Sequence, residues 1–304
     1  MEDRRRRVFE DLPELDRSVS RKSDSPVIIT CALTGVLAKK EQCPAIPYSP
    51  VEIAEEARRA YEAGAAVVHI HARTPEGGPS WESAVFGEIK AEIRKRCPVI
   101  LNFSSGGIGL PIQERTRHIT DHRPEIAALN MGSMNYAIYS RKNKAFYHDY
   151  VFANPFKDIQ YCLERIEAAG AKPELECFDV GHVGNALPFI DMGLLKTPAH
   201  FSLILGVLGG ISTRAGNLAC MAANLPEGSH WEVIGIGRDQ WRLLDEALEL
   251  GGDLRVGLED NFYLPNGEMA ASNGDLVRAA ARLVEARGFK PASVAEARSI
   301  LGLS

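Results

Sequence analysis

Short apolar runs alternate with amphipathic stretches from Pro26 onward, and this alternation restricts the possible folds more than any other feature of the sequence. Eight runs have the length of a strand and are apolar nearly throughout: VIITCAL from Val27, AAVVHIH from Ala65, PVILNFS from Pro98, IAALNMG from Ile126, PELECF from Pro173, HFSLILG from His200, WEVIGIG from Trp231 and LRVGLE from Leu254. Such runs are typical of parallel strands covered on both faces. The sequence therefore predicts a parallel α/β fold.

The stretches between these runs carry helical patterns. Ser49 before Pro50 suits a helix start, and Gly64 and Gly170 suit positions just after helices. Eight parallel strands joined by helices close into a ring, so we predict a (β/α)8 TIM barrel. An open doubly wound sheet is the alternative, but TCALTGV lacks the G-x-G-x-x-G turn typical of that fold. A last helix near Ser293–Leu301 is expected to close the bottom or an edge.

The N-terminal segment differs from the rest because it is charged and contains the basic run Arg4–Arg7. We predict an N-terminal arm over residues 1–24 and one catalytic barrel over residues 25–304. The arm is expected to be solvated, or to pack on a neighbouring subunit or near a cofactor phosphate. No repeat or composition shift indicates a second domain.

Charge and hydropathy exclude several classes of protein. A net charge of -5 and a pI near 6.0 argue against nucleic-acid binding, which needs a basic face. No apolar run reaches the roughly 18 residues of a membrane span, and no secretory signal opens the sequence. The six cysteines form no C-x-x-C pair and are scattered as buried thiols are. We therefore expect a cytoplasmic protein without membrane contact.

Two predicted strand ends carry the ligands for a metal ion. His69 and His71 are two residues apart, so both point the same way from the second strand. The eighth strand ends in Glu259, and both strands are neighbours of the first. Two histidines and one carboxylate leave open positions, the pattern of catalytic zinc, although non-haem iron uses the same set. The alternative is that these residues have no metal-binding role: the histidines would be hydrogen-bonded core residues, and the acids would belong to a surface ion-pair cluster.

The residue after Glu259 is the candidate base. Alternation along the chain puts Asp260 off the metal, and Arg255 can pair with it and keep it ionised. Small polar residues and glycines also end the third, fourth and sixth strands, where exposed amides can bind a carboxylate or phosphate: Asn102–Gly107, Asn130–Asn135 and Gly206–Gly210. On the fifth strand, one of Glu176 and Asp179 is expected to face the pocket.

Together these motifs resemble the β-keto acid cleavage enzymes, the family of 3-keto-5-aminohexanoate cleavage enzyme, from about Val27 to Leu303. The matching motifs are VVHIHAR, SSGG, LNMGSMNY, LGVLGG, GIGR and RVGLEDN, in that order. The resemblance implies a barrel that binds zinc or another divalent metal, in a homotetramer. It implies that a β-keto acid and acetyl-CoA react to give acetoacetate and a new acyl-CoA.

The resemblance also implies roles for individual residues. It implies metal ligands at His69, His71 and Glu259, an acid–base at Asp260 held by Arg255, and substrate contacts at Ser104, Gly106, Ser133 and Glu176. Members acting on the amino-bearing keto acid carry an acidic residue after Thr-Gly-x, where this chain has Leu37. Leu37 cannot neutralise an ammonium group, so a substrate with a neutral or apolar tail is expected. Arg238, after the glycines of the seventh strand, is a candidate for contact with the coenzyme.

Three other functions are consistent with parts of the pattern. A metal-dependent hydrolase of the amidohydrolase type usually has its His-x-His on the first strand and further histidines on strands five and six. Here the first strand has none, and His200 lies at the wrong end of the sixth. A metal-dependent aldolase would need no coenzyme A. A non-catalytic ligand-binding barrel predicts a broken ligand or base, whereas this chain retains the full set.

Overall fold

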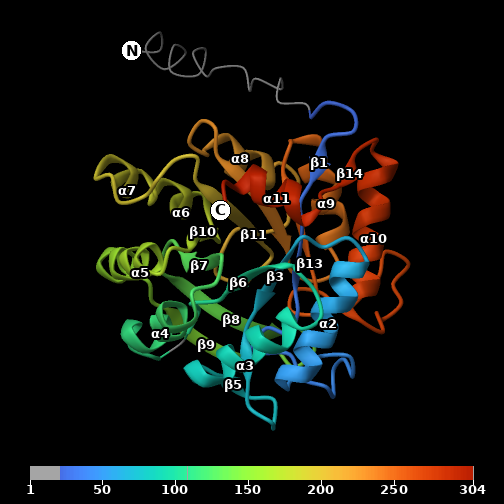
Figure 1. Ribbon diagram of the computed structural model, residues 1–304, viewed down its shortest axis with the longest axis horizontal. Coiled ribbons are helices and arrows are strands. Elements are labelled where there is room, and N and C mark those ends of the chain that lie inside the picture. The colour runs from blue at the N-terminus through green and yellow to red at the C-terminus, as the bar shows by residue number, and fades with distance from the viewer. Residues whose placement is uncertain (1–20, 108, 304) are drawn as a thin grey trace.

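Eight parallel strands close into a barrel in the computed structural model, which describes residues 21–107 and 109–303 (Figure 1). The strands follow one another around the ring in chain order: β2 (Ile29–Ala32), β3 (Val67–Ile70), β6 (Ile100–Phe103), β7 (Ile126–Asn130), β10 (Lys172–Cys177), β11 (His200–Leu205), β12 (His230–Gly235) and β13 (Asp253–Val256). The predicted TIM barrel is confirmed, and the open-sheet alternative is wrong, because β13 pairs with β2 and leaves no edge.

Helices surround the barrel in Figure 1. They are α2 (Pro50–Glu62), α3 (Ser83–Arg94), α4 (Ile112–His122), α5 (Phe156–Ala168), α6 (Val180–Gly184), α7 (Leu187–Asp191), α8 (Asn217–Ala223), α9 (Gln240–Glu249), α10 (Asn273–Ala286) and α11 (Val294–Leu301). Three two-stranded sheets lie outside the barrel: β1 (Pro26–Val27) with β14 (Lys290–Pro291), β4 (Ala72–Arg73) with β5 (Pro79–Ser80), and β8 (Met134–Ser140) with β9 (Ala145–Phe152).

The predicted helix signals act as expected. Ser49 caps α2 by accepting from the Glu52 backbone, and the Glu52 side chain accepts in return from the Ser49 backbone. This reciprocal capping box satisfies two amides that the helix itself cannot satisfy. Gly64 and Gly170 follow the C-caps of α2 and α5 with positive φ angles.

The outward-facing side chains of the strands form the main apolar core. Phe201 and Leu203 on β11 and Val233 on β12 are fully buried in this layer. Fully burying one such side chain contributes about 1.5–3 kcal/mol relative to leaving it exposed. The layer between the sheet and the helices is therefore the principal source of stability.

In the middle of the barrel, several inward-facing side chains of the same strands are polar, which the apolar character of the runs did not predict. The Thr30 hydroxyl donates to Glu232 at 2.6 Å, and the Ser202 hydroxyl donates to the same carboxylate at 3.2 Å. The Asn102 amide donates to Glu174 at 2.5 Å. Burial raises the pKa of Glu174 to about 8 and that of Glu232 to about 7. A buried carboxyl network thus fills the middle of the barrel.

The N-terminal ends of the strands are closed by α11. Ala297 and Leu301 of this helix pack against Ile28, Val67 and Ile100, all of which are buried. The last helix was expected to close the bottom or an edge, and it closes the bottom. Access to the barrel interior must therefore be sought at the opposite end.

The predicted arm is described only in part, since Arg4–Arg7 lie outside the described residues. Arg21 donates to Asp253 at 2.5 Å and to the carbonyl of Pro26 at 2.8 Å, so it is tied to the bottom of the barrel. Five cysteines are buried and Cys220 is exposed, with no disulfide among them. Within residues 21–107 and 109–303, no helix is long and apolar enough to cross a membrane.

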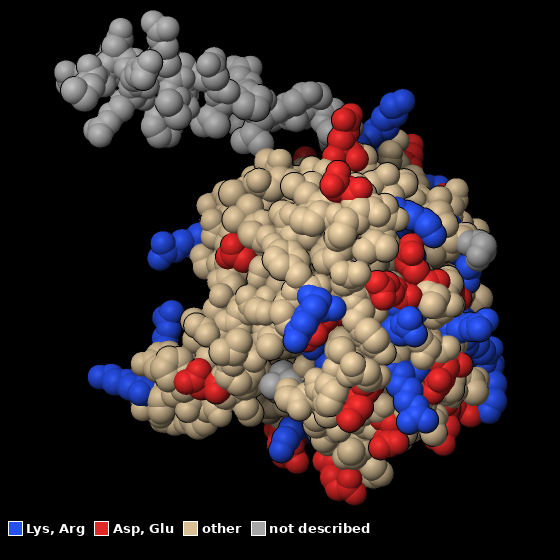
Figure 2. Space-filling model, turned by 90° about the vertical axis from the view of Figure 1, so that its left-hand side faces the viewer, with Lys and Arg blue, Asp and Glu red and all other residues tan. Residues whose placement is uncertain are grey.

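The hairpin formed by β8 and β9 was not predicted, because the stretches between the barrel strands were expected to be helical. Its register shifts between Ile138 and Tyr139, which marks a β-bulge. A backbone bridge joins Ala137 to Leu208 in the loop after β11. Figure 2 shows a lobe projecting from the lower left of the molecule, with Lys and Arg side chains at its tip and a hollow above it.

Candidate active site and metal centre

A cavity of about 820 Å³ opens at the C-terminal ends of the barrel strands. Its lining includes His71, Ser104, Glu176, Arg255 and Glu259. These side chains come from four different strands or the loops that follow them. This placement agrees with the rule that the reactive residues of such barrels lie at this end.

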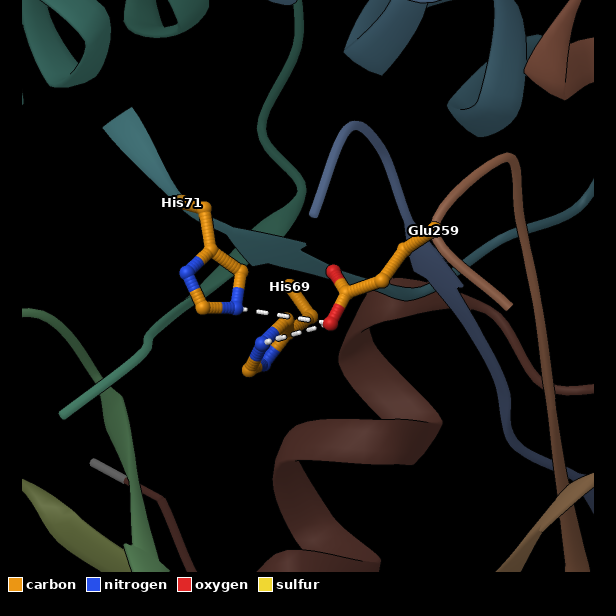
Figure 3. A group of neighbouring side chains, drawn as sticks. All are labelled: His69, His71 and Glu259. Carbon is orange, nitrogen blue, oxygen red and sulfur yellow. Dashed lines mark ion pairs between the residues drawn. The ribbon is translucent and has the colours of Figure 1, made fainter. Parts of the chain in front are cut away.

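The three predicted metal ligands converge at the floor of the cavity (Figure 3). The Nε2 atom of His71 lies 3.4 Å from Oε1 of Glu259, and Nε2 of His69 lies 3.8 Å from the same oxygen. One ligand atom from each residue lies within 4.8 Å of the others. The spacing is wide enough to admit a cation between the three atoms and close enough for them to share it.

The electrostatics of the three residues suit a metal. Burial and the nearby Arg255 hold the pKa of His69 well below its usual range, so its imidazole is neutral, the form that binds metals. Burial opposes the charge of Glu259, but His71 and Arg255 outweigh it and keep the pKa of this carboxyl well below its usual range. Three buried atoms lack a hydrogen-bond partner among the described residues: both ring nitrogens of His69 and Oε2 of Glu259. Buried polar atoms without partners are costly, and a bound cation would satisfy them.

Backbone geometry places Glu259 beside the histidines. Its N–H donates to the carbonyl of Ala32 at 3.2 Å, which ties the end of β13 to β2. A Cβ atom at Gly257, where φ is +141°, would lie 2.1 Å from that same carbonyl oxygen, so only glycine fits. A Cβ atom at Gly35 would lie 2.8 Å from Cγ of Glu259. The position of the carboxylate thus depends on both glycines.

Arg255 pairs with Asp260 as predicted. Its Nε and Nη2 atoms lie 2.9 and 3.0 Å from the two Asp260 oxygens, and Nη2 also lies 3.0 Å from Glu259. Arg255 and Asp260 are 2% and 6% exposed, so the pair is hardly screened by water. Burial raises the pKa of Asp260 to about 6 although Arg255 lowers it. The carboxylate is therefore charged at neutral pH and remains basic.

The predicted polar loop after β6 also lines the cavity. The Gly106 N–H donates to the Ser104 hydroxyl at 3.1 Å, and the Trp81 indole donates to the Gly106 carbonyl at 3.0 Å. The buried Asn130 amide nitrogen, without a partner in the described chain, reaches the same cavity. This side of the cavity offers hydrogen-bonding groups for a small polar ligand.

Of the two acids considered on the fifth strand, Glu176 faces the cavity. It lies 3.7 Å from Nη1 of Arg255, and burial raises its pKa to about 8. Asp179 instead caps α6 by accepting from the Gly181 backbone. Glu174 lies one layer deeper in the barrel, bonded to Asn102.

The other wall of the cavity is apolar. Phe152 and Phe178 pack edge to face at 6.2 Å beside Ile204 and Ile234. Leu37, which is 37% exposed, lies on the rim. Small ligands with a polar head and an apolar tail match a cavity with these two walls.

Two predicted site residues lie elsewhere. The Ser133 hydroxyl accepts from the Asn154 backbone at 2.7 Å and does not line the cavity. Arg238 is exposed, does not line the cavity, and stacks on the Tyr263 ring with its Cζ atom 3.9 Å from the ring centroid. Neither placement supports the role expected for the residue.

Sequence analysis missed several cavity residues, mainly the hairpin side chains Tyr136, Tyr150 and Phe152, and it named Asn130 only as part of the polar segment Asn130–Asn135. Asn130 lies two residues after Ala128, so strand alternation puts both side chains on the inward face of their strand. The returning strand of the hairpin has aromatic residues at alternate positions, Phe146, Tyr150 and Phe152 among them, and this alternation is a strand signal.

Known proteins resemble this chain over nearly all of the described part. The sequence profile of the family described as beta-keto acid cleavage enzyme matches residues 26–303. The chain is 38% identical over 279 residues to the "3-keto-5-aminohexanoate cleavage enzyme" of Fusobacterium nucleatum subsp. nucleatum, covering 91% of this chain and 98% of that protein. It is 36% identical over 296 residues to the "3,5-dioxohexanoate:acetyl-CoA acetone transferase" of Paraburkholderia graminis, covering 91% and 96%.

Solved structures support the same architecture. The chain is similar to "Apo structure of ObcA", with a TM-score of 0.70 and 24% sequence identity. The match covers 86% of this chain and 66% of that protein, so this chain spans about two thirds of its length. At this identity the likeness shows a shared barrel fold.

Proposed function

The chain belongs to the β-keto acid cleavage enzyme family, and from this premise we propose that it converts a β-keto acid and acetyl-CoA into acetoacetate and a new acyl-CoA. The observation that carries the proposal is the convergence of His69, His71 and Glu259 within 4.8 Å, beside the paired Asp260 and Arg255. We further propose zinc as the cation, since two imidazoles and one carboxylate suit it. A cytoplasmic homotetramer completes the proposal.

The proposed chemistry begins with removal of a proton. When bound, the cation would polarise the ketone of the β-keto acid and stabilise the negative charge that develops on its oxygen. Asp260 takes the proton from the carbon between the two carbonyl groups, held in place by the two hydrogen bonds from Arg255. Ser104 and the amide side chain of Asn130 offer hydrogen bonds to the substrate carboxylate.

Carbon–carbon bond cleavage then follows with a balanced exchange of groups. The carbanion attacks the acetyl-CoA carbonyl, so a carbon–carbon bond forms and the thioester bond breaks. The released thiolate adds to the original ketone carbon, and the bond to the central carbon breaks. Asp260 returns its proton to that carbon, which leaves as part of acetoacetate, and the rest of the keto acid leaves as acyl-CoA.

The tail of the substrate is proposed to be neutral and apolar. Leu37 on the rim and the wall formed by Phe178, Ile204 and Ile234 offer no group that could neutralise an ammonium ion. Desolvating a charged amine against such a wall would be costly. A β-keto acid with an alkyl tail fits the cavity better than 3-keto-5-aminohexanoate.

The proposal is tested by incubating zinc-loaded protein with 3-ketohexanoate or 3-keto-5-aminohexanoate, each with and without acetyl-CoA. We expect acetoacetate only with acetyl-CoA, and faster with the alkyl substrate. Turnover without acetyl-CoA would instead identify a hydrolase or an aldolase. In Leu37→Glu, the preference should move toward the amino-bearing acid; an equal fall for both substrates would argue against a tail contact at Leu37.

A further inference from the structure

The β8–β9 hairpin forms one side of the cavity and carries an unpaired group of cations at its tip. Arg141, Lys142 and Lys144 are all exposed. None of the three forms an ion pair within the described residues, whereas other exposed cations, such as Arg94, Arg242 and Arg287, have acidic partners. The hairpin holds these three cations against one acid, Asp149, in a chain whose net charge is -5. The tip is therefore a local site of positive charge.

The cavity reaches almost to these cations. Tyr139, Tyr150 and His148 line it, and Tyr139 lies two residues before Arg141. At about 3.4 Å per residue, the tip begins roughly 7 Å beyond the last hairpin residue of the cavity wall. The cations thus stand at the outer rim, away from the metal centre at the floor.

Aromatic side chains continue from the cavity wall toward the tip of the hairpin. Ile138 and Tyr139 both line the cavity, and the register shift beside them leaves Tyr147 of β9 as the extra residue of the bulge. The Tyr139 ring packs on Phe146 of the opposite strand, with ring centroids 5.1 Å apart. These rings are 43% and 57% exposed, so they offer aromatic surface beside the cationic tip.

Another cation lies on the part of the rim that is formed by the loop after β2. Lys39 lines the cavity and is exposed, with no ion pair in the described part of the chain. The buried Arg73 holds this loop by donating to the carbonyls of Thr34, Val36 and Ala38. The rim is therefore fixed in place before a ligand arrives.

From this arrangement we infer that the hairpin tip binds the phosphorylated nucleotide of coenzyme A, while the pantetheine arm lies along the hairpin face of the cavity. Phosphates need cations, and exposed aromatic rings suit the adenine base. In coenzyme A, a long pantetheine arm separates the nucleotide from the thioester. This separation matches the distance between the cations at the rim and the reactive groups at the floor of the cavity. This inference rests on the proposed function, and it replaces Arg238 as the coenzyme contact.

The test compares coenzyme A with pantetheine in binding titrations on the full-length protein. The tip variant carries Arg141→Ser, Lys142→Ser and Lys144→Asn, since asparagine tolerates the positive φ of 49° at residue 144. We expect its Kd for coenzyme A to rise about tenfold, because three exposed ion pairs to the phosphates would be lost. The Kd for pantetheine, which lacks the nucleotide, should not change. The control variant carries Lys22→Ser, Arg117→Ser and Arg282→Ser, which remove the same charge from residues outside the cavity lining.

The outcomes separate this inference from the proposed function. An unchanged coenzyme A affinity in the tip variant, or an equal loss in the control variant, overturns the inference even if acetoacetate is formed. Loss of affinity only in the tip variant supports it even if no acetoacetate is formed, in which case the proposed reaction fails. If the tip variant binds coenzyme A normally but sedimentation shows a change in its oligomeric state, the hairpin is a contact between copies of the chain. That result would also overturn the inference.

Discussion

The two faces of each barrel strand differ in their chemistry. On β11, Phe201 and Leu203 point outward into the apolar layer, and Ser202 between them bonds Glu232 inside the barrel. On β12, Val233 points outward and Glu232 inward. The outward face is a source of stability, whereas the inward face buries ionisable groups, which costs stability, and carries site residues such as Glu176 and Arg255. Substitutions on the two faces should therefore fail in different ways.

The largest effect is expected on the inward face, at Asp260. Asp260→Asn removes the proposed base but keeps the shape of the side chain, so kcat should fall by about 10²–10⁴-fold while zinc content and Tm stay near those of the wild type. Steady-state rates, metal analysis and thermal unfolding measure the three quantities. Normal turnover would remove Asp260 from the mechanism. The exposed Asp191→Asn is the control for loss of one charge.

On the outward face, Phe201→Ala should show the opposite pattern. Phe201 is fully buried, and its truncation should lower the free energy of unfolding by about 3–5 kcal/mol. Because the side chain points away from the cavity, kcat per folded molecule should remain close to that of the wild type. Denaturant unfolding and active-site titration test both parts. The matched control is Phe156→Ala, since Phe156 is 53% exposed.

The cost of the inward charges should appear as a pH dependence of stability. Burial raises the pKa of Glu232 from 4.5 to about 7, so the folded state holds this proton more tightly than the unfolded state. The resulting stability is fully present below pH 4.5 and is lost as the pH rises through about 7, an effect on the order of 2–3 kcal/mol. Glu232→Gln should flatten this slope in metal-free protein, as measured by unfolding between pH 5 and 8. An unchanged slope would show that Glu232 is not its source; Glu227→Gln, at an exposed position, is the control.

The smallest effect is expected at the closed end of the barrel. The Ser293 hydroxyl accepts from the Glu296 backbone at the start of α11, and the Glu296 carboxylate accepts in return from the Ser293 backbone. Ser293→Ala should lower the free energy of unfolding by about 1 kcal/mol and leave kcat unchanged. Restoring the cap with Ser293→Asp should recover the loss. A large fall in kcat would contradict the view that α11 serves structure alone.

Much of the fold and the floor of the site follows from local sequence patterns. The eight strands were predicted because each run is apolar over a strand length, and His69, His71 and Glu259 because strand order makes their strands near neighbours. Glu232 and Thr30 were missed although both stand at inward positions, because a run that is apolar on average conceals one polar residue.

The hairpin could not be placed from its own sequence. Its position depends on contacts with distant segments, including the bridge between Ala137 and Leu208. The same applies to Ser133, whose hydroxyl is taken by Asn154 after the hairpin returns. Local patterns indicate that a strand exists, but only tertiary contacts decide which way its ends point.

The loop after β2 borders both the rim of the cavity and the proposed metal ligand Glu259. Gly35 leaves room for the Glu259 side chain, and Leu37, two residues later, lines the cavity at its rim. Under the proposed function, a change at residue 37 would alter which acids are accepted, whereas a side chain at residue 35 would displace Glu259. New specificities can therefore arise in this loop by single substitutions, provided that the glycine beside them is inherited intact.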